Sequence, residues 1–290
     1  MDFSYKEFTT RNIGFVTKGE QDRLKNANLF VCGTGGMGGA AIMALVRAGV
    51  GSFTIADLDE FEVSNLNRQL FCTMKTVAKH KAEATRDACL DINPEAKLNV
   101  YHDDWPDHIE TAIEAADIVI NGTDDLGASL LIYRTARKFK KTVVDAYASP
   151  LPSVYVTRAH EKMPEERLGY PTINTNWNEI TDEQRLQSFL REAEYVIINS
   201  SSRKHIDNAI AGEVAAGVRS RMSFAPMVIS TGMLMAYECI GGILGRQSPT
   251  DAQGWFFNPY SARIERPTNP LLAATMRPFV RRFMQRLMAQ

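Results

Sequence analysis

Cysteine is scarce in this 290-residue chain, and its four cysteines are scattered. Cys32, Cys72, Cys89 and Cys239 include no pair at C-x-x-C spacing. This arrangement argues against a structural zinc site and against the disulfide framework of a small secreted domain. We therefore expect no zinc in this protein.

An excess of positive charge is also missing. The chain has 33 Lys and Arg against 34 Asp and Glu, so its net charge is -1. No overall basic field would attract nucleic acid, and DNA is not an expected partner. Residues 1–12 are mixed and charged, without the apolar stretch of a signal peptide. These features favour a cytoplasmic location.

One apolar run, at residues 222–245, is long enough to suggest a membrane span. It contains Pro226, Glu238 and several glycines, and it lacks the aromatic and basic flanks typical of a spanning helix. A buried core helix that starts near Pro226 is the better interpretation. We expect no membrane partner.

Strand and helix patterns alternate through the first half of the chain. The expected strands are 29–32, 52–57, 98–102, 117–122 and 142–147, and the expected helices are 20–28, 40–50, 76–91, 108–116 and 129–140. Such alternation is typical of a doubly wound, mostly parallel sheet. The predicted fold class is therefore α/β and Rossmann-like.

The character of the chain changes after residue 150. We expect one domain over 1–290, with a nucleotide-binding part at 20–150, a crossover and substrate region at 151–222, and a C-terminal part at 223–290. Within them we expect a helix at 181–194, a short strand at 195–199, a core helix at 226–245, a closing pair of antiparallel strands within 254–266 and a basic amphipathic helix at 276–290. The last helix is expected to pack on its own chain, although docking on a partner or a membrane surface stays open.

A glycine-rich turn follows the first expected strand. Gly33, Gly35 and Gly38 form a G-x-G-x-x-G pattern, and Gly36 and Gly39 lie beside them. Glycine lets the backbone approach a phosphate, and the start of the next helix offers free N–H groups and a positive dipole end. The pattern fits NAD, FAD or ATP equally well.

A polar segment after the second strand favours ATP. Asp57 and Asp59 end that strand, where an acid reaches ribose hydroxyls. Asn65, Arg68 and Gln69 follow closely in S-N-L-N-R-Q, and Lys81 lies thirteen residues after Arg68 at an expected helix start. A triphosphate needs such cations, whereas a nicotinamide cofactor needs no polar cluster here.

Asp124 follows the fourth strand in N-G-T-D-D. A carboxylate at the carboxyl end of a parallel strand is well placed to hold Mg²⁺ against phosphates. Capping of the next helix is the alternative role, which Thr123, Asp124 or Asp125 could supply. The five histidines show no spacing typical of metal ligands.

With these motifs, the sequence resembles the E1-like superfamily, which includes ThiF, MoeB and the ubiquitin-activating enzymes. The resemblance covers residues 11–149 and returns at 224–245. It implies the following roles: residues 33–38 approach the ATP phosphates, Asp57 binds the ribose, Asn65, Arg68 and Lys81 bind the triphosphate, Gln69 supports them, and Asp124 binds Mg²⁺. Arg11 resembles an N-terminal arginine that reaches into the neighbouring subunit's site, which implies a homodimer.

Two departures from this superfamily matter. Many of its members carry paired C-x-x-C motifs for zinc, and many carry a crossover-loop cysteine that forms a thioester. This chain has neither, since residues 90–238 contain no cysteine. Thioester transfer by the usual route is therefore not expected.

The resemblance implies an ATP-dependent adenylyltransferase that converts a carboxylate into an acyl-adenylate and releases pyrophosphate. The carboxylate could belong to a small carrier protein, a precursor peptide or a small-molecule acid. An ionised carboxylate attacks phosphorus without a general base, so no catalytic histidine is needed. An NAD(P)- or FAD-dependent oxidoreductase and a catalytically inactive E1-like partner subunit are the alternatives.

Overall fold

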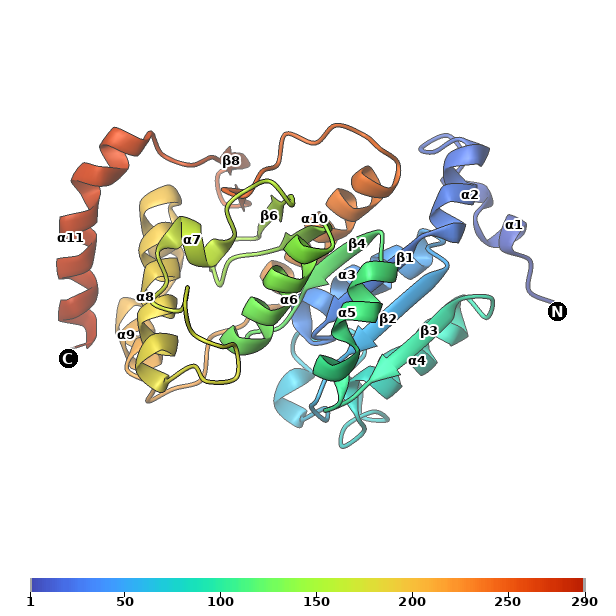
Figure 1. Ribbon diagram of the computed structural model, residues 1–290, viewed down its shortest axis with the longest axis horizontal. Coiled ribbons are helices and arrows are strands. Elements are labelled where there is room, and N and C mark those ends of the chain that lie inside the picture. Colours follow the sequence, from blue (N-terminus) through green and yellow to red (C-terminus); the bar gives the residue numbers. More distant parts are fainter. Residues whose placement is uncertain (1, 289–290) are drawn as a thin grey trace.

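An eight-stranded sheet forms the centre of the computed structural model, which describes residues 2–288 (Figure 1). The strand order is β3-β2-β1-β4-β5-β6-β7-β8. The strands are β1 (Asn28–Cys32), β2 (Ser52–Ala56), β3 (Lys97–Tyr101), β4 (Ile118–Asn121), β5 (Thr142–Asp145), β6 (Ser153–Thr157), β7 (Trp255–Asn258) and β8 (Arg263–Glu265). The first five are parallel and the last three are antiparallel. The expected fold class is confirmed.

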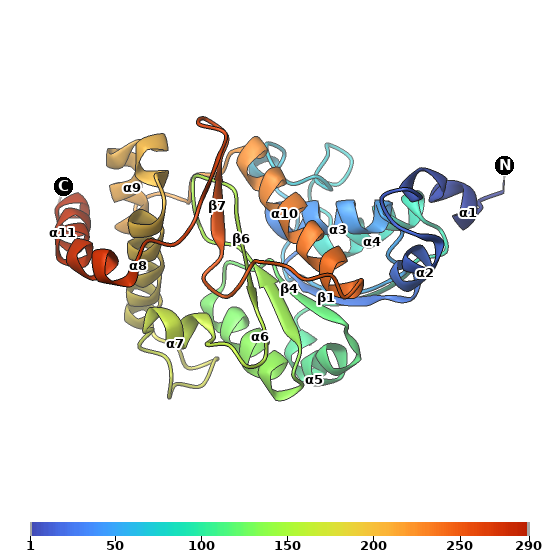
Figure 2. The same cartoon turned by 90° about the horizontal axis from the view of Figure 1, so that it is seen from above.

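Helices cover both faces of the parallel part of the sheet (Figure 2). They are α1 (Tyr5–Phe8), α2 (Lys18–Asn26), α3 (Gly36–Arg47), α4 (Lys81–Ile92), α5 (Trp105–Ala115), α6 (Leu126–Lys138), α7 (Pro164–Leu168), α8 (Asp182–Asn199), α9 (Asn208–Ala215), α10 (Ala225–Ile243) and α11 (Pro270–Met288). Side chains of β1 alternate between the two faces: Leu29 and Val31 join the core under α3 and α10, whereas Phe30 and Cys32 join the core under α5 and α6.

Helix α10 returns the chain to the core, as expected from the sequence. Its buried stripe includes Val228, Met235 and Cys239 and packs on α3. A Cβ on Gly232 would lie 2.5 Å from the Cβ of Ala40, so glycine lets the two helices approach closely. By length and composition alone, α10 is the one helix in residues 2–288 that could cross a membrane.

One expectation about the second half was wrong, and one strand was missed. Residues 195–199, expected as a strand, form the last part of α8. The run is continuously apolar because Val196 packs toward the sheet while Ile198 packs toward α11, and a helix buried on two sides imitates a strand pattern. Strand β6 was not anticipated, although every one of its residues is buried.

Two helices in the first half of the chain begin at other residues than expected. Helix α4 begins at Lys81 rather than at residue 76. Ala78 takes a φ of 63° and donates its N–H to the carbonyl of Phe61, which prevents an earlier start. Helix α3 begins at Gly36, inside the glycine-rich turn rather than after it.

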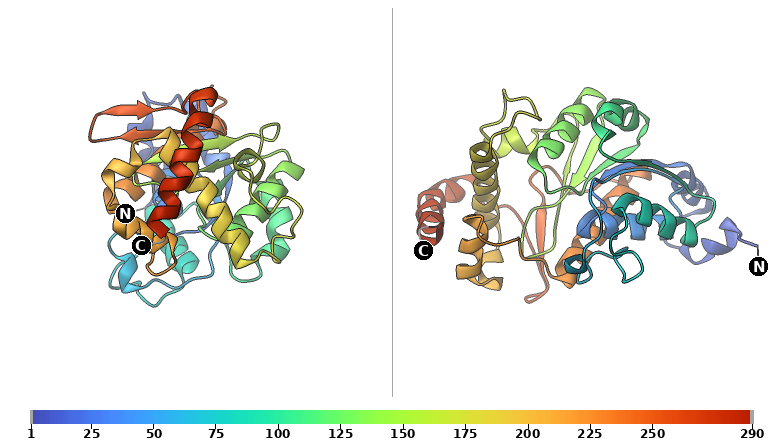
Figure 3. Two further views of the ribbon diagram at one scale, coloured as in Figure 1. Left: turned by 90° about the vertical axis from the view of Figure 1, so that its left-hand side faces the viewer. Right: turned by 90° about the horizontal axis from the view of Figure 1, so that it is seen from below.

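The C-terminal helix packs on the chain itself through residue 288. Figure 3 (left) shows α11 in red across the yellow and orange helices α8 and α9. Val280 and Met284 are buried, and Arg281 donates to the buried carboxylate of Glu194 at 2.6 Å. The packed helix is thus confirmed, with its start at Pro270 rather than at residue 276; residues 289–290 lie outside the described chain.

Candidate nucleotide and substrate site

The glycine-rich turn lies at the switch point of the sheet, where β1 has β2 on one side and β4 on the other. Gly33 has a φ of 89°, and a Cβ there would lie 2.5 Å from the backbone of Gly122. A Cβ on Gly38 would lie 1.9 Å from the carbonyl oxygen of Gly33. The turn therefore folds tightly against the end of β4, and only glycine fits at these two positions.

The next part of the turn is more open. A Cβ on Gly35 would meet only the side chain of Gln69, at 3.5 Å. Gly36 opens α3, and a Cβ there would lie 2.5 Å from Val228 of α10. The backbone at Gly35 can thus be approached from outside, next to the N-terminal N–H groups of α3, as an anion requires.

Asp57 fastens this turn to β2. Its Oδ2 accepts hydrogen bonds from the N–H (2.7 Å) and the hydroxyl (3.0 Å) of Thr34, and its Oδ1 accepts from the N–H of Asp59 at 3.0 Å. This anchoring role was not anticipated. A carboxylate has about four acceptor positions, so contact with a ribose hydroxyl remains compatible with these bonds.

Lys81 is the first residue of α4, and its side chain is buried. The ammonium forms an ion pair with the exposed carboxylate of Asp59 at 2.7 Å. Since Asp59 donates its N–H to Asp57, the pair is connected directly to the anchor of the glycine-rich turn. The structure thus brings Asp57, Asp59 and Lys81 together.

The S-N-L-N-R-Q segment wraps the open side of the turn. Asn65 accepts a hydrogen bond from the N–H of Glu62 at 3.1 Å and so shapes the segment. Arg68 has its Cγ 3.9 Å from the position of a Cβ on Gly36. Gln69 is buried beside Gly35, and its Oε1 has no hydrogen-bond partner within residues 2–288.

Asp124 and Asp125 have separate environments. Asp125 caps α6, since its Oδ1 accepts from the N–H of Ala128 at 2.8 Å, and its Oδ2 pairs with Arg185. Asp124 is exposed and makes no side-chain hydrogen bond or ion pair in the described part of the chain. The capping role therefore belongs to Asp125, and the carboxylate of Asp124 is available.

Arg11 lies away from these residues. It is exposed, and its neighbour Asn12 donates to the carbonyl of Ala48 at 3.1 Å, just beyond the C-terminal end of α3. The glycine-rich turn is at the opposite end of this helix, about 18 Å away for twelve residues. Within one chain, Arg11 does not join the site.

A cavity of about 240 Å³ adjoins Asp124. Met37 and Asp124 line one part of it, Asp145 lies at the carboxyl end of β5, and Ser188 and Glu192 contribute from α8. The cavity therefore extends from the glycine-rich turn to the crossover region. It is large enough for a group of about amino-acid size.

Residues 9–273 match the ThiF family. The chain belongs to the ThiF family. Over 152 residues it is 33% identical to the adenylyltransferase and sulfurtransferase MOCS3 of Culex quinquefasciatus, covering 52% of this chain and 35% of that protein. Over 114 residues it is 40% identical to the molybdopterin-synthase adenylyltransferase of Salmonella typhimurium, covering 39% of this chain and 45% of that protein. These matches span less than half the length of either relative.

The ThiF-family chain also resembles solved structures. The microcin C7 biosynthetic enzyme MccB in complex with N-formylated MccA gives a TM-score of 0.64 at 18% identity, covering 93% of this chain and 76% of that one. The E. coli MccB structure with ATP gives 0.60 at 18% identity, covering 87% and 67%. At these identities the likeness concerns the fold.

In this ThiF-family chain, a buried carboxylate that the sequence analysis missed lies at the cavity wall. Asp145 Oδ2 accepts from Asn121, Tyr133 and Tyr155 at 2.7–2.8 Å, and its Oδ1 accepts from the N–H of Ala146 at 2.6 Å. Burial raises the pKa of Asp145 to about 6, although the four donors oppose the shift. The sequence signal that could have identified Asp145 is its position at the carboxyl end of β5, since Asp57 likewise stands at the carboxyl end of β2.

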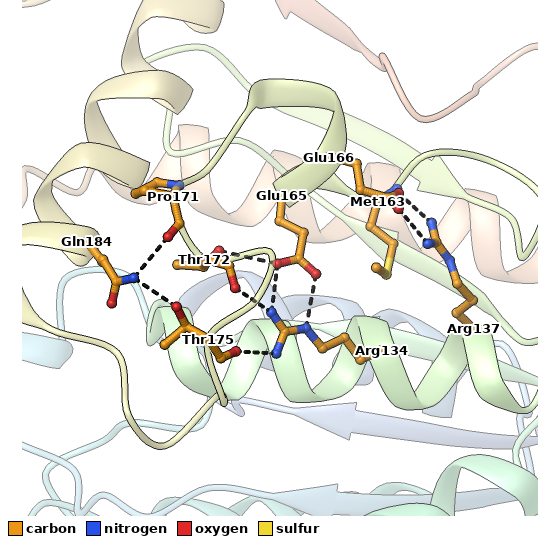
Figure 4. Close-up of polar contacts among 9 residues, drawn as sticks. All are labelled: Arg134, Arg137, Met163, Glu165, Glu166, Pro171, Thr172, Thr175 and Gln184. Carbon is orange, nitrogen blue, oxygen red and sulfur yellow. Dashed lines mark hydrogen bonds and ion pairs between the residues drawn. The ribbon is translucent and has the colours of Figure 1, made fainter.

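Two arginines of α6 clamp the crossover region of this family member (Figure 4). Arg134 donates to both carboxylate oxygens of the buried Glu165 at 2.8 and 3.0 Å, and to the carbonyls of Thr172 and Thr175. Arg137 and Glu166 form a second two-bond pair. These contacts fix the cavity wall formed by the start of α7, and no local sequence pattern indicates them.

A third arginine of the ThiF-family chain lies within an aromatic cage. The guanidinium of Arg167 lies 4.9–5.7 Å from the ring centres of Tyr147, Tyr155 and Tyr195. Its nitrogen atoms are buried and have no hydrogen-bond partner within residues 2–288. The ring faces stabilise this charge.

Proposed function

We propose that this chain is an ATP-dependent adenylyltransferase that activates a carboxylate. One observation carries the proposal: the glycine-rich turn, two cations and an unpaired carboxylate meet at one edge of the sheet, next to a cavity of substrate size. The names of the curated relatives support it, since both are called adenylyltransferases. The match to MccB, which has been solved with ATP, supports ATP as the nucleotide.

The backbone around Gly35 and the first N–H groups of α3 would receive the phosphates. Arg68 uses only one guanidinium nitrogen in its bonds to Ser64 and Asn67, so its other N–H groups can reach a phosphate oxygen. Lys81 has three donors and can keep Asp59 while it binds a second anion. Asn65 and Gln69 would hold these cations in place.

A magnesium ion is the metal that this nucleotide would bring. The unpaired carboxylate of Asp124 fits that role, since Mg²⁺ in nucleotide sites uses one or two carboxylates together with phosphates and water. Residues 2–288 contain no group of three or more His, Cys, Asp and Glu side chains that could hold a metal without the nucleotide. When bound, Mg²⁺ would offset negative charge on the phosphates.

The reaction would be ATP + R-COO⁻ → R-CO-AMP + pyrophosphate. A carboxylate oxygen forms a bond to the α-phosphorus, and the bond from that phosphorus to the β-phosphate oxygen breaks. No proton has to move in this step, so the protein only aligns the reactants and neutralises the leaving pyrophosphate. Arg68 and Lys81 are the residues placed for that neutralisation.

The acyl-adenylate would pass to a separate nucleophile. All four cysteines are buried, which supports a route without a thioester on this chain. We further propose that the active unit is a cytoplasmic homodimer, since the exposed Arg11 could reach only a second copy's site. The carboxylate would come from a carrier protein, a precursor peptide or a small acid; the MccB structure contains the peptide MccA.

Exchange of labelled pyrophosphate into ATP, measured with Mg²⁺ and a panel of candidate carboxylates, tests the proposal. We expect Asp124→Ala to lower the exchange rate by about 100-fold or more without unfolding, because charge on the phosphates is then poorly offset. Asp91→Ala, an exposed change on α4, is the matched control and should leave exchange intact. Binding of NADH but not ATP would overturn the assignment in favour of an oxidoreductase.

A further inference from the structure

The cavity beside Asp124 carries two buried oxygen atoms without partners. Asn121 is 3% exposed and Ser188 is 2% exposed, and both line the cavity. Neither Asn121 Oδ1 nor Ser188 Oγ has a hydrogen-bond partner within residues 2–288. Buried polar atoms in native proteins are nearly always paired, so these two point to a ligand that completes them.

The orientation of Asn121 is fixed by its neighbours. Its amide nitrogen donates to Asp145 at 2.8 Å and to Ser129 at 2.9 Å. Since a carboxylate only accepts hydrogen bonds, the nitrogen must face Asp145 and the oxygen must be the unpaired atom. The ligand therefore has to supply a hydrogen-bond donor at this point.

Negative charge lines the same cavity. Glu192 accepts one hydrogen bond in the described chain, from the N–H of Ala148 at 2.7 Å, and Asp145 lies nearby on the wall. Arg185 pairs with Asp125, and the charge of the exposed Arg221 acts on Glu192, where it opposes the rise in pKa that burial causes. The buried part of the cavity thus presents two unpaired acceptors beside two carboxylates whose pKa values burial raises, and a cation with several N–H donors would pair with the acceptors and keep the carboxylates ionised.

We propose that the cavity selects a carboxylate of amino-acid size whose far end is a protonated amine. This inference rests on the proposed function, since the carboxylate must lie beside the nucleotide while the amine contacts Asn121, Ser188 and Glu192. A volume of about 240 Å³ accommodates a group of amino-acid size, such as the last residue of a protein substrate.

Four matched carboxylates test this selection in the pyrophosphate exchange assay. They are N-acetyl-lysine, N-acetyl-glutamine, N-acetyl-norleucine and N-acetyl-glutamate, whose α-amines are blocked so that only the far end differs. We expect kcat/KM to fall in that order, with lysine at least about tenfold above norleucine, because norleucine leaves the buried acceptors unpaired. ATP binding is measured separately on the same protein.

A variant pair locates the selectivity. Glu192→Gln should reduce the lysine-to-norleucine ratio about tenfold, because it removes the carboxylate that would pair with the amine. Glu183→Gln makes the same chemical change on the exposed side of α8 and should leave the ratio unchanged. Loss of the ratio in both variants would contradict a direct contact of Glu192 with the amine.

The outcomes separate the two proposals. If norleucine or glutamate is exchanged as well as lysine, the inference is wrong and the adenylyltransferase function stands. If ATP binds but none of the four compounds is exchanged, an amine of this size is not the substrate and the inference also fails. If ATP does not bind at all, the proposed function itself is wrong.

Discussion

The two halves of the candidate site are built in different ways. The nucleotide half draws most of its residues from one stretch of sequence, residues 33–81, within which Asp57 holds the glycine-rich turn through Thr34. The cavity half uses side chains far apart in sequence, such as Arg134 with Glu165 and Arg134 with Thr175. A nucleotide common to a family can be bound by a contiguous motif, whereas a particular substrate is bound by a surface assembled from distant residues.

The largest predicted loss of stability comes from a substitution in the nucleotide half of the site. Gly38→Ala places a Cβ 1.9 Å from a backbone carbonyl oxygen that cannot move aside, so we expect a loss of more than about 4 kcal/mol in unfolding free energy, or no folding. Gly35→Ala meets only the flexible Gln69 side chain and should fold within about 1 kcal/mol of the parent while binding ATP more weakly. Urea unfolding and ATP titration measure both; equal stabilities would contradict the backbone argument.

The next largest predicted loss of stability comes from a substitution in the cavity half of the site. Glu165→Gln leaves Arg134 without its ion pair; Glu165 is 3% and Arg134 28% exposed at the side chain, so we expect a loss of about 3 kcal/mol. Glu110→Gln removes the pair with Lys138 on the same helix α6, but these side chains are 59% and 56% exposed, so it should cost less than about 0.5 kcal/mol. Similar losses in the two variants would show that the buried clamp is not special.

The smallest effect concerns pH and also belongs to the cavity half. The pKa of Asp145 rises from 3.8 to about 6 on folding, so the folded state holds an extra proton between these values. The contribution of Asp145 to the stability of the parent should therefore fall by on the order of 2–3 kcal/mol as the pH rises from about 4 to 6. Asp145→Asn should lack this contribution, so the difference between the two stability curves should change across that range. Parallel stability curves for parent and variant across that range would disprove the shift.

The nucleotide half could be predicted from the sequence to a greater extent than the cavity half. The parallel strands and the position of Arg68 and Gln69 beside the glycine-rich turn follow from local patterns, and the structure agrees with them. The expected helix start at residue 76 was wrong, because Ala78 takes a positive φ and donates to the distant Phe61. Arg11 stayed a prediction, since its proposed contact needs a second chain. The roles assigned to the nucleotide residues also await the experiments above.

The cavity could not be predicted because its contacts have no local pattern. Nothing near Arg134 in sequence indicates that its partner is Glu165, and nothing near Asp145 indicates that Tyr133 and Tyr155 will donate to it. Residues 195–199 were misassigned because burial on two sides removes the helical period on which the prediction depends. In each case the structure depends on contacts between residues far apart in sequence rather than on local secondary-structure propensity.

The close packing of α10 on α3 has a consequence for how the protein is made. The ribosome finishes α3 at residue 47, but it reaches α10 only at residue 225. At typical synthesis rates of about 5–20 residues per second, those intervening residues take roughly 10–40 seconds. During that interval the apolar face of α3 has no α10 to cover it, and Val228 is not yet present beside Gly36. The earliest part of the nucleotide site is therefore completed by one of the last parts of the chain to emerge.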